Sequence, residues 1–166
     1  VSLLGPSGCG KTTLLKLASG IEKLQEGEIK LNNKTISSSN THLSPDKRKI
    51  GYVFQDCALF PHLTILQNIF FGLNSKEIIA QTKKIQNLMN EINISNLSKS
   101  YPHELSGGQQ QQVALVRAIA SDPKIILLDE PYSNLDSRLK EKIRDQMLHI
   151  LREYNISALL VTHDPE

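Results

Sequence analysis

Four short apolar segments divide the chain and have the character of buried strands. They are Val1–Leu4, Ile50–Phe54, Ile125–Leu128 and Ala158–Val161, each bounded by turn residues. Runs this continuous, without polar alternation, are typical of strands that are covered on both faces in a parallel sheet. The pattern therefore predicts an α/β fold with a parallel sheet at its centre.

A helix is expected between the last two of these strands. From Ser137 to Glu153, apolar residues recur at the spacing of one helix face, while Arg, Lys and Glu fill the other positions. The apolar positions are Leu139, Ile143, Met147, Ile150 and Leu151. A strand, a helix and a strand in this order predict a right-handed crossover between parallel strands.

The middle of the chain has a different pattern. From about Leu63 to Pro123 the spacing is helical, and Ser106 stands where it would cap a helix that reaches Ala120. One apolar stripe of this region is formed by Ile78, Ile85, Leu88, Met89 and Ile92. The earlier stretch Asn32–Lys49 is rich in Asn, Ser, Thr and Lys, and it predicts polar turns and a surface loop.

Length and composition narrow the class of protein only slightly. The chain has 166 residues, of which 39% are hydrophobic and 22% charged, with a net charge of +2. These values are ordinary for one soluble domain and favour neither a nucleic acid nor a membrane as partner. Cys9 and Cys57 show no metal-ligand spacing, so reduced thiols are expected. Strand-like runs lie at both ends of the chain, from which we expect a fragment of a longer domain.

The first strand leads into a phosphate-binding motif. The segment is Gly5, Pro6, Ser7, Gly8, Cys9, Gly10, Lys11 and Thr12, and it fits G-x-x-x-x-G-K-[ST] at every fixed position. Glycines let the backbone turn its N–H groups toward phosphate oxygens, and the following helix directs its positive dipole end at them. Lys11 would reach the β- and γ-phosphates, and the Thr12 hydroxyl would bind magnesium. A glycine-rich turn without a ligand is the weaker alternative.

An acidic pair at the end of a buried strand supplies the other half of a nucleotide site. Asp129 and Glu130 follow the run Ile125–Leu128. Asp129 is the candidate for the magnesium side, and Glu130 for the group that polarises the attacking water. Such a pair on its own is more often a solvated turn. The functional interpretation depends on the phosphate motif in the same chain.

A glycine-rich segment before the acidic strand carries the most specific pattern. It reads Leu105-Ser106-Gly107-Gly108-Gln109. This segment resembles the signature motif of ABC ATPases, and the family's other motifs surround it in the family's order over essentially the whole chain. In chain order they are the phosphate loop, Gln55, the signature, the acidic strand, the segment Ser133–Asp136, and His163.

This resemblance implies an ATP site divided between two chains. In the family, two such domains pair head to tail, so that the signature of one meets the γ-phosphate held by Lys11 of the other. The implied nucleotide-binding residues are Gly5, Pro6, Ser7, Gly8, Cys9, Gly10, Lys11, Thr12, Thr13, Ser106, Gly107, Gly108, Gln109 and Asp136. The implied catalytic residues are Glu130, His163 and Gln55, and the implied magnesium residues are Thr12, Gln55 and Asp129. ATP and Mg2+ are the implied cofactors.

The resemblance also implies a domain plan and partners. The expected fold is a P-loop NTPase parallel sheet flanked by helices, with a helical subdomain inserted between Gln55 and the signature. The core is expected at about 1–62 and 123–166, and the subdomain at about 63–122, in a single domain truncated at both ends. Expected partners are a second ATPase subunit, transmembrane permease subunits and, indirectly, a substrate-binding protein, but no nucleic acid. The expected location is the cytoplasmic face of the inner membrane.

The transported solute is the least constrained expectation. The run Gln55–Thr64 looks like importer subunits, and the runs Tyr101–Leu105 and Pro131–Asp136 look most like the iron(III) uptake group. Polyamine, sulfate and sugar importers and translation-factor ATPases are the alternatives. A GTPase is disfavoured because Asn33-Lys34-Thr35-Ile36 has no aspartate to read guanine, and a scaffold without hydrolysis is disfavoured by Glu130.

Overall fold

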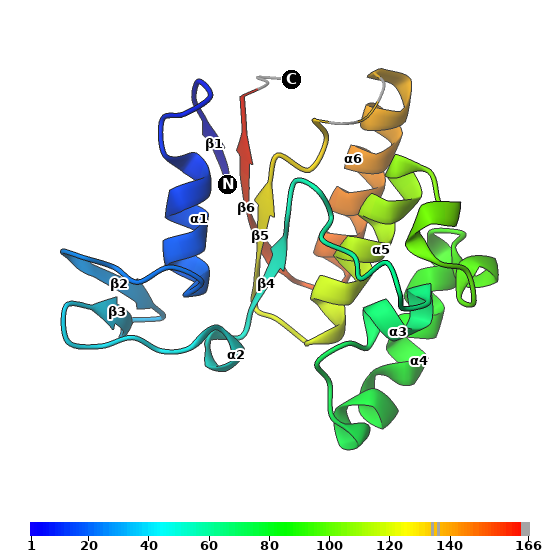
Figure 1. Cartoon of the computed structure of the whole chain (residues 1–166), viewed down its shortest axis with the longest axis horizontal. Helices are drawn as coiled ribbons and strands as arrows, with labels where there is room; N and C mark the ends of the chain where they lie inside the picture. The colour runs from blue at the N-terminus through cyan, green and yellow to red at the C-terminus, as the bar shows by residue number, and fades with distance from the viewer. Residues whose placement is uncertain (134, 136, 164–166) are drawn as a thin grey trace.

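A parallel sheet organises the molecule (Figure 1). The computed structural model describes residues 1–133, 135 and 137–163, with the side chains of 137 and 138 left out. Within this part the sheet has four strands, all parallel to their neighbours. In spatial order they are β1 (Ser2–Leu4), β6 (Ser157–Thr162), β5 (Ile125–Asp129) and β4 (Ile50–Val53). The four predicted strands are confirmed to within one or two residues.

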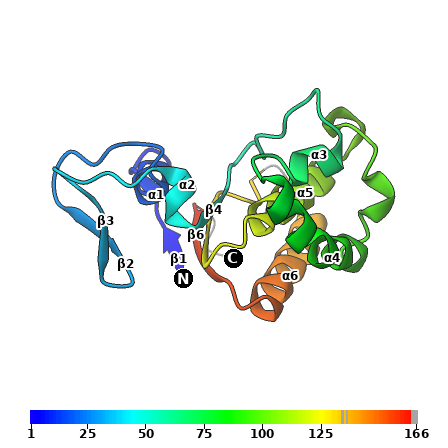
Figure 2. The same ribbon diagram turned by 90° about the horizontal axis from the view of Figure 1, so that it is seen from below.

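Helices cover both faces of this sheet (Figure 2). The helix α1 (Lys11–Ser19) lies on one face, and α5 (Gly107–Ala120) and α6 (Ser137–Glu153) lie on the other. Side chains of β5 alternate accordingly: Leu127 packs with Leu15 of α1, whereas Ile126 and Leu128 belong to the core under α5 and α6. The strand is therefore buried on both sides, as its continuous apolar run predicted.

The region between β4 and β5 is helical. It holds α3 (Ile65–Ile69), α4 (Ser75–Glu91), short 3-10 turns at Ser95–Leu97 and Pro102–Glu104, and α5. Capping boxes start α3, α4 and α5 at Thr64, Asn74 and Ser106, where each side chain accepts a hydrogen bond from a first-turn N–H. The predicted cap at Ser106 and the predicted helix end at Ala120 are confirmed. Among the described helices, none has the length and the apolar character to cross a membrane.

The prediction of polar turns and a surface loop at Asn32–Lys49 was wrong for about half of that stretch. An antiparallel hairpin forms from β2 (Glu28–Leu31) and β3 (Lys34–Ser38), followed by the short helix α2 (Pro45–Arg48). The turn residues Asn32 and Asn33 have φ values of 49° and 63°, a left-handed backbone that Asn tolerates well. The polar composition belongs to a hairpin that buries Ile36 and Ser37 and exposes its other polar side chains in part or fully, rather than to an irregular loop.

A buried arginine attaches this hairpin to α1. Arg48 is 1% exposed, and its guanidinium donates to Ser37 Oγ of β3 at 2.8 Å. It also donates to the carbonyl oxygens of Leu43, Leu17 and Ala18 at 2.7 to 2.9 Å. The last two carbonyls belong to the end of α1, where the helix dipole favours a cation. Gly20 leaves room for this group, because a Cβ there would lie 2.5 Å from the Arg48 Nε. Arg48 therefore fixes the end of α1 that is opposite the phosphate motif.

Candidate functional site

The phosphate motif forms a tight loop between β1 and α1. Gly8 and Gly10 have φ values of 81° and 92°, which side-chain-bearing residues rarely adopt. Gly10 is the N-cap of α1. A Cβ on Gly5 would lie 2.9 Å from the Cys9 sulfur, so a larger residue there would force the exposed Cys9 side chain to move. The loop thus needs its glycines for geometry, as the motif predicts.

Lys11 is folded into the loop that it follows. Its ammonium donates to the carbonyl oxygens of Gly5 and Pro6 at 2.8 and 2.9 Å, and the residue is 7% exposed. These bonds compensate carbonyl dipoles that would otherwise repel an anion. The loop, its ammonium and the start of α1 together make an anion-binding environment.

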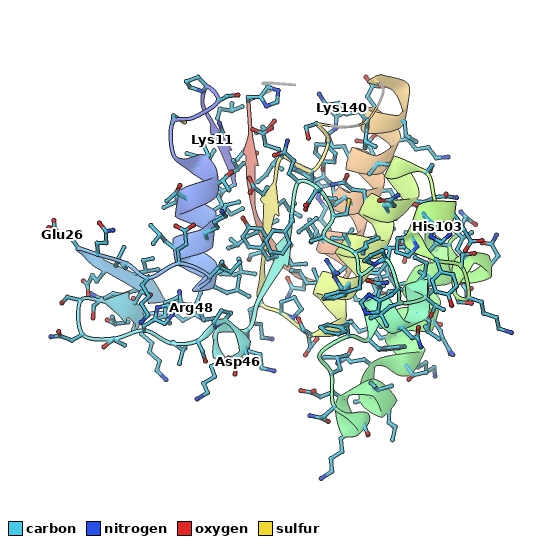
Figure 3. The ribbon with its side chains drawn as sticks, in the orientation of Figure 1. Lys11, Glu26, Asp46, Arg48, His103 and Lys140 are labelled. Atoms are coloured by element: carbon cyan, nitrogen blue, oxygen red, sulfur yellow. The ribbon has the colours of Figure 1, made fainter. Side chains whose placement is uncertain are left out.

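A polar pocket of about 350 Å3 opens beside this loop. It is lined by Ser7, Gly8, Gly10, Lys11, Thr12, Thr13, Gln55 and Glu130. The structure therefore brings residues of the phosphate motif together with two predicted catalytic residues from distant parts of the chain. In Figure 3, Lys11 lies at the carboxyl ends of the strands, where open α/β sheets bind ligands.

Asp129 at the end of β5 is held by two hydroxyl groups. Thr12 Oγ1 donates to one carboxylate oxygen at 2.9 Å, and the Tyr52 hydroxyl donates to the other at 3.0 Å. Asp129 is 4% exposed. Burial, followed by the nearby Asp129 carboxylate, raises the pKa of Tyr52, which keeps its hydroxyl a proton donor. Tyr52 was not among the predicted site residues, although a hydroxyl in an apolar strand next to β5 could have indicated it.

The pair formed by Thr12 and Asp129 fits a magnesium ion. A hydroxyl and a carboxylate are the hard oxygen donors that Mg2+ prefers, and here two such oxygens already lie 2.9 Å apart. Gln55 lines the same pocket, where its side-chain nitrogen donates to Ser133 Oγ at 3.3 Å.

Glu130 has an unusual backbone conformation. Its φ of 45° lies in the left-handed region, which is sparsely populated by residues other than glycine and often marks a functional site. Its N–H donates to the carbonyl of Val161 at 2.9 Å, which fixes the turn against β6. The Glu130 side chain is 15% exposed and lies 2.9 Å from His163 Nδ1. The structure therefore joins these two predicted catalytic residues directly.

A short chain of hydrogen bonds also links Glu130 to Gln55. Ser133 Oγ accepts from Gln55 and donates to the carbonyl oxygen of Glu130 at 3.1 Å. Glu130 lines both the phosphate pocket and an adjoining pocket of about 140 Å3 that Ser133 and His163 also line. Its carboxylate is thus placed to accept a proton from a water molecule beside the phosphate loop.

The signature residues lie elsewhere in the molecule. His103, three residues before Ser106, and Lys11 are on opposite sides of the sheet in Figure 3, and α1 and α5 lie on opposite faces in Figures 1 and 2. Ser106 and Gln109 cap α5, and Gly108 is buried against α6. One chain therefore carries two separate groups of predicted site residues. The predicted nucleotide contact Asp136 lies outside the described residues.

Comparisons with known proteins agree with this arrangement. Residues 1–133 match the family model described as ABC transporter. The Fe(3+) ions import ATP-binding protein FbpC 2 of Haemophilus influenzae is 49% identical over 98% of this chain and 46% of its own length. The sulfate/thiosulfate import ATP-binding protein CysA of Neisseria meningitidis is 41% identical over all of this chain and 47% of its own. The chain spans about half the length of these relatives.

A solved structure supports the same assignment. The dimeric ATP-binding cassette MJ0796, bound to ADP and Pi in a post-hydrolysis state, superimposes with a TM-score of 0.78. It is 33% identical, over 98% of this chain and 74% of that one. The fold is that of a P-loop NTPase, as predicted. The chain belongs to the ABC transporter family of ATP-binding proteins.

Proposed function

We propose that this chain is the ATP-binding and ATP-hydrolysing part of an ABC importer. The observation that carries the proposal is the meeting of Lys11, Thr12, Asp129 and Glu130 at the carboxyl end of one parallel sheet. This set supplies an anion-binding loop, two hard oxygen ligands and a carboxylate base, which are the parts that phosphoryl transfer needs.

ATP binding is assigned to the phosphate loop. The N–H groups of residues 8 to 13 at the start of α1 bind the phosphate oxygens, and the Lys11 ammonium turns from its two carbonyls toward the β- and γ-phosphates. Thr12 and Asp129, with Gln55 nearby, hold Mg2+, which neutralises charge on the phosphates when bound.

Hydrolysis is assigned to Glu130 and the groups around it. The carboxylate orients a water molecule and accepts its proton as the water attacks the γ-phosphorus. His163, 2.9 Å from that carboxylate, fixes its position, and we assign it a contact with the γ-phosphate from the adjoining pocket that it lines. Gln55 lines the same pocket and helps to orient this water molecule. Its hydrogen bond to Ser133 holds the Gln55 side chain beside Glu130.

The second half of the site comes from another copy or a homologous subunit. Ser106, Gly107, Gly108 and Gln109 stand at the N-terminus of α5, a position suited to an anion, yet on the opposite side of the sheet from Lys11. Pairing head to tail would bring each signature to the partner's phosphate loop, and Asp136 is assigned to this contact. The dimeric state of the MJ0796 structure supports the pairing.

A groove next to Gln55 suits a permease subunit. It measures about 410 Å3 and is lined by residues that include Tyr52, Phe54, Phe60 and Phe71. Phe71 is 55% exposed, and an exposed aromatic groove of this kind fits an amphipathic helix. We assign it to a cytoplasmic helix of the membrane partner. We also propose that the chain lies at the cytoplasmic face of the inner membrane. The substrate-binding protein would contact the permease alone, and no nucleic acid is involved.

For the cargo we propose iron(III), with a polyamine, sulfate or a sugar as the alternatives. The iron relative shares more identity with this chain than the sulfate relative does, 49% against 41%. We further propose that about 63–122 forms a helical subdomain on a core of about 1–62 and 123–166. Uptake of radiolabelled iron(III), a polyamine, sulfate and a sugar by cells that lack the gene tests the cargo, since only the true solute loses its uptake.

Glu130→Gln tests the proposed chemistry. The amide keeps the size of the side chain but cannot accept the proton, so turnover is expected to fall by about 100-fold or more while ATP still binds. Turnover and binding of a fluorescent ATP analogue are measured in the full-length protein with its permease, beside the exposed control Glu26→Gln. Turnover at the wild-type rate in Glu130→Gln would refute the assignment.

A further inference from the structure

We propose that Arg117 is a positioning residue that holds the Gln55 loop, residues 54–58, in its working conformation and ties it to the signature helix. The inference rests on the proposed function, because it concerns how the same site is organised. It assigns Arg117 no contact with nucleotide or water. Its effect on the reaction passes through Gln55.

The Gln55 loop is a strained turn. The Cys57 N–H donates to the Phe54 carbonyl at 3.0 Å, which closes the turn around Gln55. Cys57 and Ala58 then have φ values of 60° and 44°, so two successive residues with side chains occupy the left-handed region. Such a conformation persists only where surrounding contacts enforce it.

Arg117 supplies those contacts. From the last turn of α5, its Nη2 donates to the Cys57 carbonyl and its Nη1 to the Ala58 carbonyl, both at 2.7 Å. The planar guanidinium thus spans the carbonyls of the two strained residues with a fixed geometry that a lysine ammonium cannot reproduce. The Phe60 ring lies beneath it, with its centroid 5.9 Å from the Arg117 Cζ. Burial lowers the pKa of Arg117, although the residue keeps its charge.

This clamp connects two parts of the proposed site. On one side Gln55 reaches Ser133, which in turn donates to the Glu130 carbonyl. On the other side α5 runs back to its cap at Ser106 over roughly 15 Å, at about 1.5 Å per residue. A rigid helix held to the loop at one end and bearing the signature at the other makes their positions interdependent.

A double-mutant cycle tests whether Arg117 acts through Gln55. Turnover and the KM for ATP are measured in the full-length protein with its permease for Gln55→Ala, Arg117→Lys and the double variant, with the exposed Arg152→Lys as control. Arg117→Lys is expected to lower kcat by about tenfold with KM changed less than about twofold, because a misplaced group affects the reacting geometry more than binding. The double variant is expected to be no slower than Gln55→Ala alone.

Three outcomes of this cycle would overturn the inference. One is wild-type turnover in Arg117→Lys. Another is a double variant whose loss is the product of the two single losses, which would show that the residues act independently. The third is a fall in kcat accompanied by a clear drop in Tm and a similar fold-loss of ATP affinity. This result would mean that Arg117 has a purely structural role. An inactive wild-type protein would instead count against the proposed function.

The loop itself offers a test that needs no turnover. Cys57 is 6% exposed, and in a Cys9→Ser background it is the remaining thiol of the chain. If Arg117 holds the loop closed, Arg117→Lys is expected to speed the reaction of Cys57 with a disulfide reagent by about tenfold or more, because opening of the loop limits access. The inference fails if this rate matches that of the Arg117 parent, whatever the ATPase result.

Discussion

Replacing Gly108 with alanine tests how the signature helix is held on the core. Gly108 is buried, and a Cβ there would lie 2.7 Å from Ile143 Cδ1 and 3.0 Å from Leu139 Cδ2, both on α6. Ile143 is only 4% exposed, so it has little room to move. Overpacking of this kind costs about 1–3 kcal/mol, whereas alanine gains up to about 1 kcal/mol over glycine in a helix. We expect a net destabilisation of roughly 0–3 kcal/mol.

The neighbouring glycine provides a matched control. A Cβ on Gly107 would meet nothing closer than Leu135 Cδ2 at 3.9 Å. Gly107→Ala should therefore show only the gain in helix propensity, and its free energy of unfolding should stay unchanged or rise by less than about 1 kcal/mol. Urea denaturation of both variants measures the difference between the two positions.

A second substitution identifies the clash as the cause. Ile143→Val removes the Cδ1 atom nearest to the new methyl group, and on its own it is expected to cost about 0.5–1.5 kcal/mol. In the Gly108→Ala background the methyl group fills that space, so the two changes should offset each other by about 1 kcal/mol or more. Strictly additive changes in unfolding free energy would refute the packing argument.

The remaining predictions concern the pocket. Tyr52→Phe removes one of two hydroxyl donors to buried Asp129 and should lower the free energy of unfolding by about 1.5–3 kcal/mol. Urea denaturation measures this change, and an unchanged free energy of unfolding would contradict the prediction. A thiol reagent should inactivate the enzyme at exposed Cys9, and ATP should protect it; full activity after modification of Cys9, checked by mass spectrometry, would contradict this. Cys57 should stay unmodified, because burial raises its pKa to about 11.

The sequence was most informative where one physical cause dominates. The strands were found because burial on both faces leaves only apolar residues, and α6 was found with its observed bounds because its apolar positions share one face. The hairpin β2–β3 was missed because its strands are short, and their polar residues outnumber the apolar Ile29, Leu31 and Ile36, so the segment has nearly the composition of a loop. The role of Arg48 could not be predicted, since its partners are main-chain carbonyls from separate segments.

For the candidate site, the sequence indicated residues but not their contacts. The phosphate motif and the acidic pair could be placed because each needs fixed residue types at fixed spacing next to a strand. The hydrogen bonds of Tyr52 with Asp129 and of Arg117 with the Gln55 loop depend on how strands and helices meet in space. Gly108 likewise reads as part of a ligand motif, and only the packing against α6 shows a second need for glycine.

If the ATPase site is completed by pairing of two chains, ATP hydrolysis must depend on the concentration of the protein. Magnesium-dependent ATP hydrolysis by the full-length protein is followed across a range of protein concentrations, wild type beside Lys11→Ala. We expect activity that rises more steeply than linearly with protein concentration and disappears in Lys11→Ala. Activity strictly proportional to concentration at all levels, or hydrolysis that survives Lys11→Ala, would contradict it.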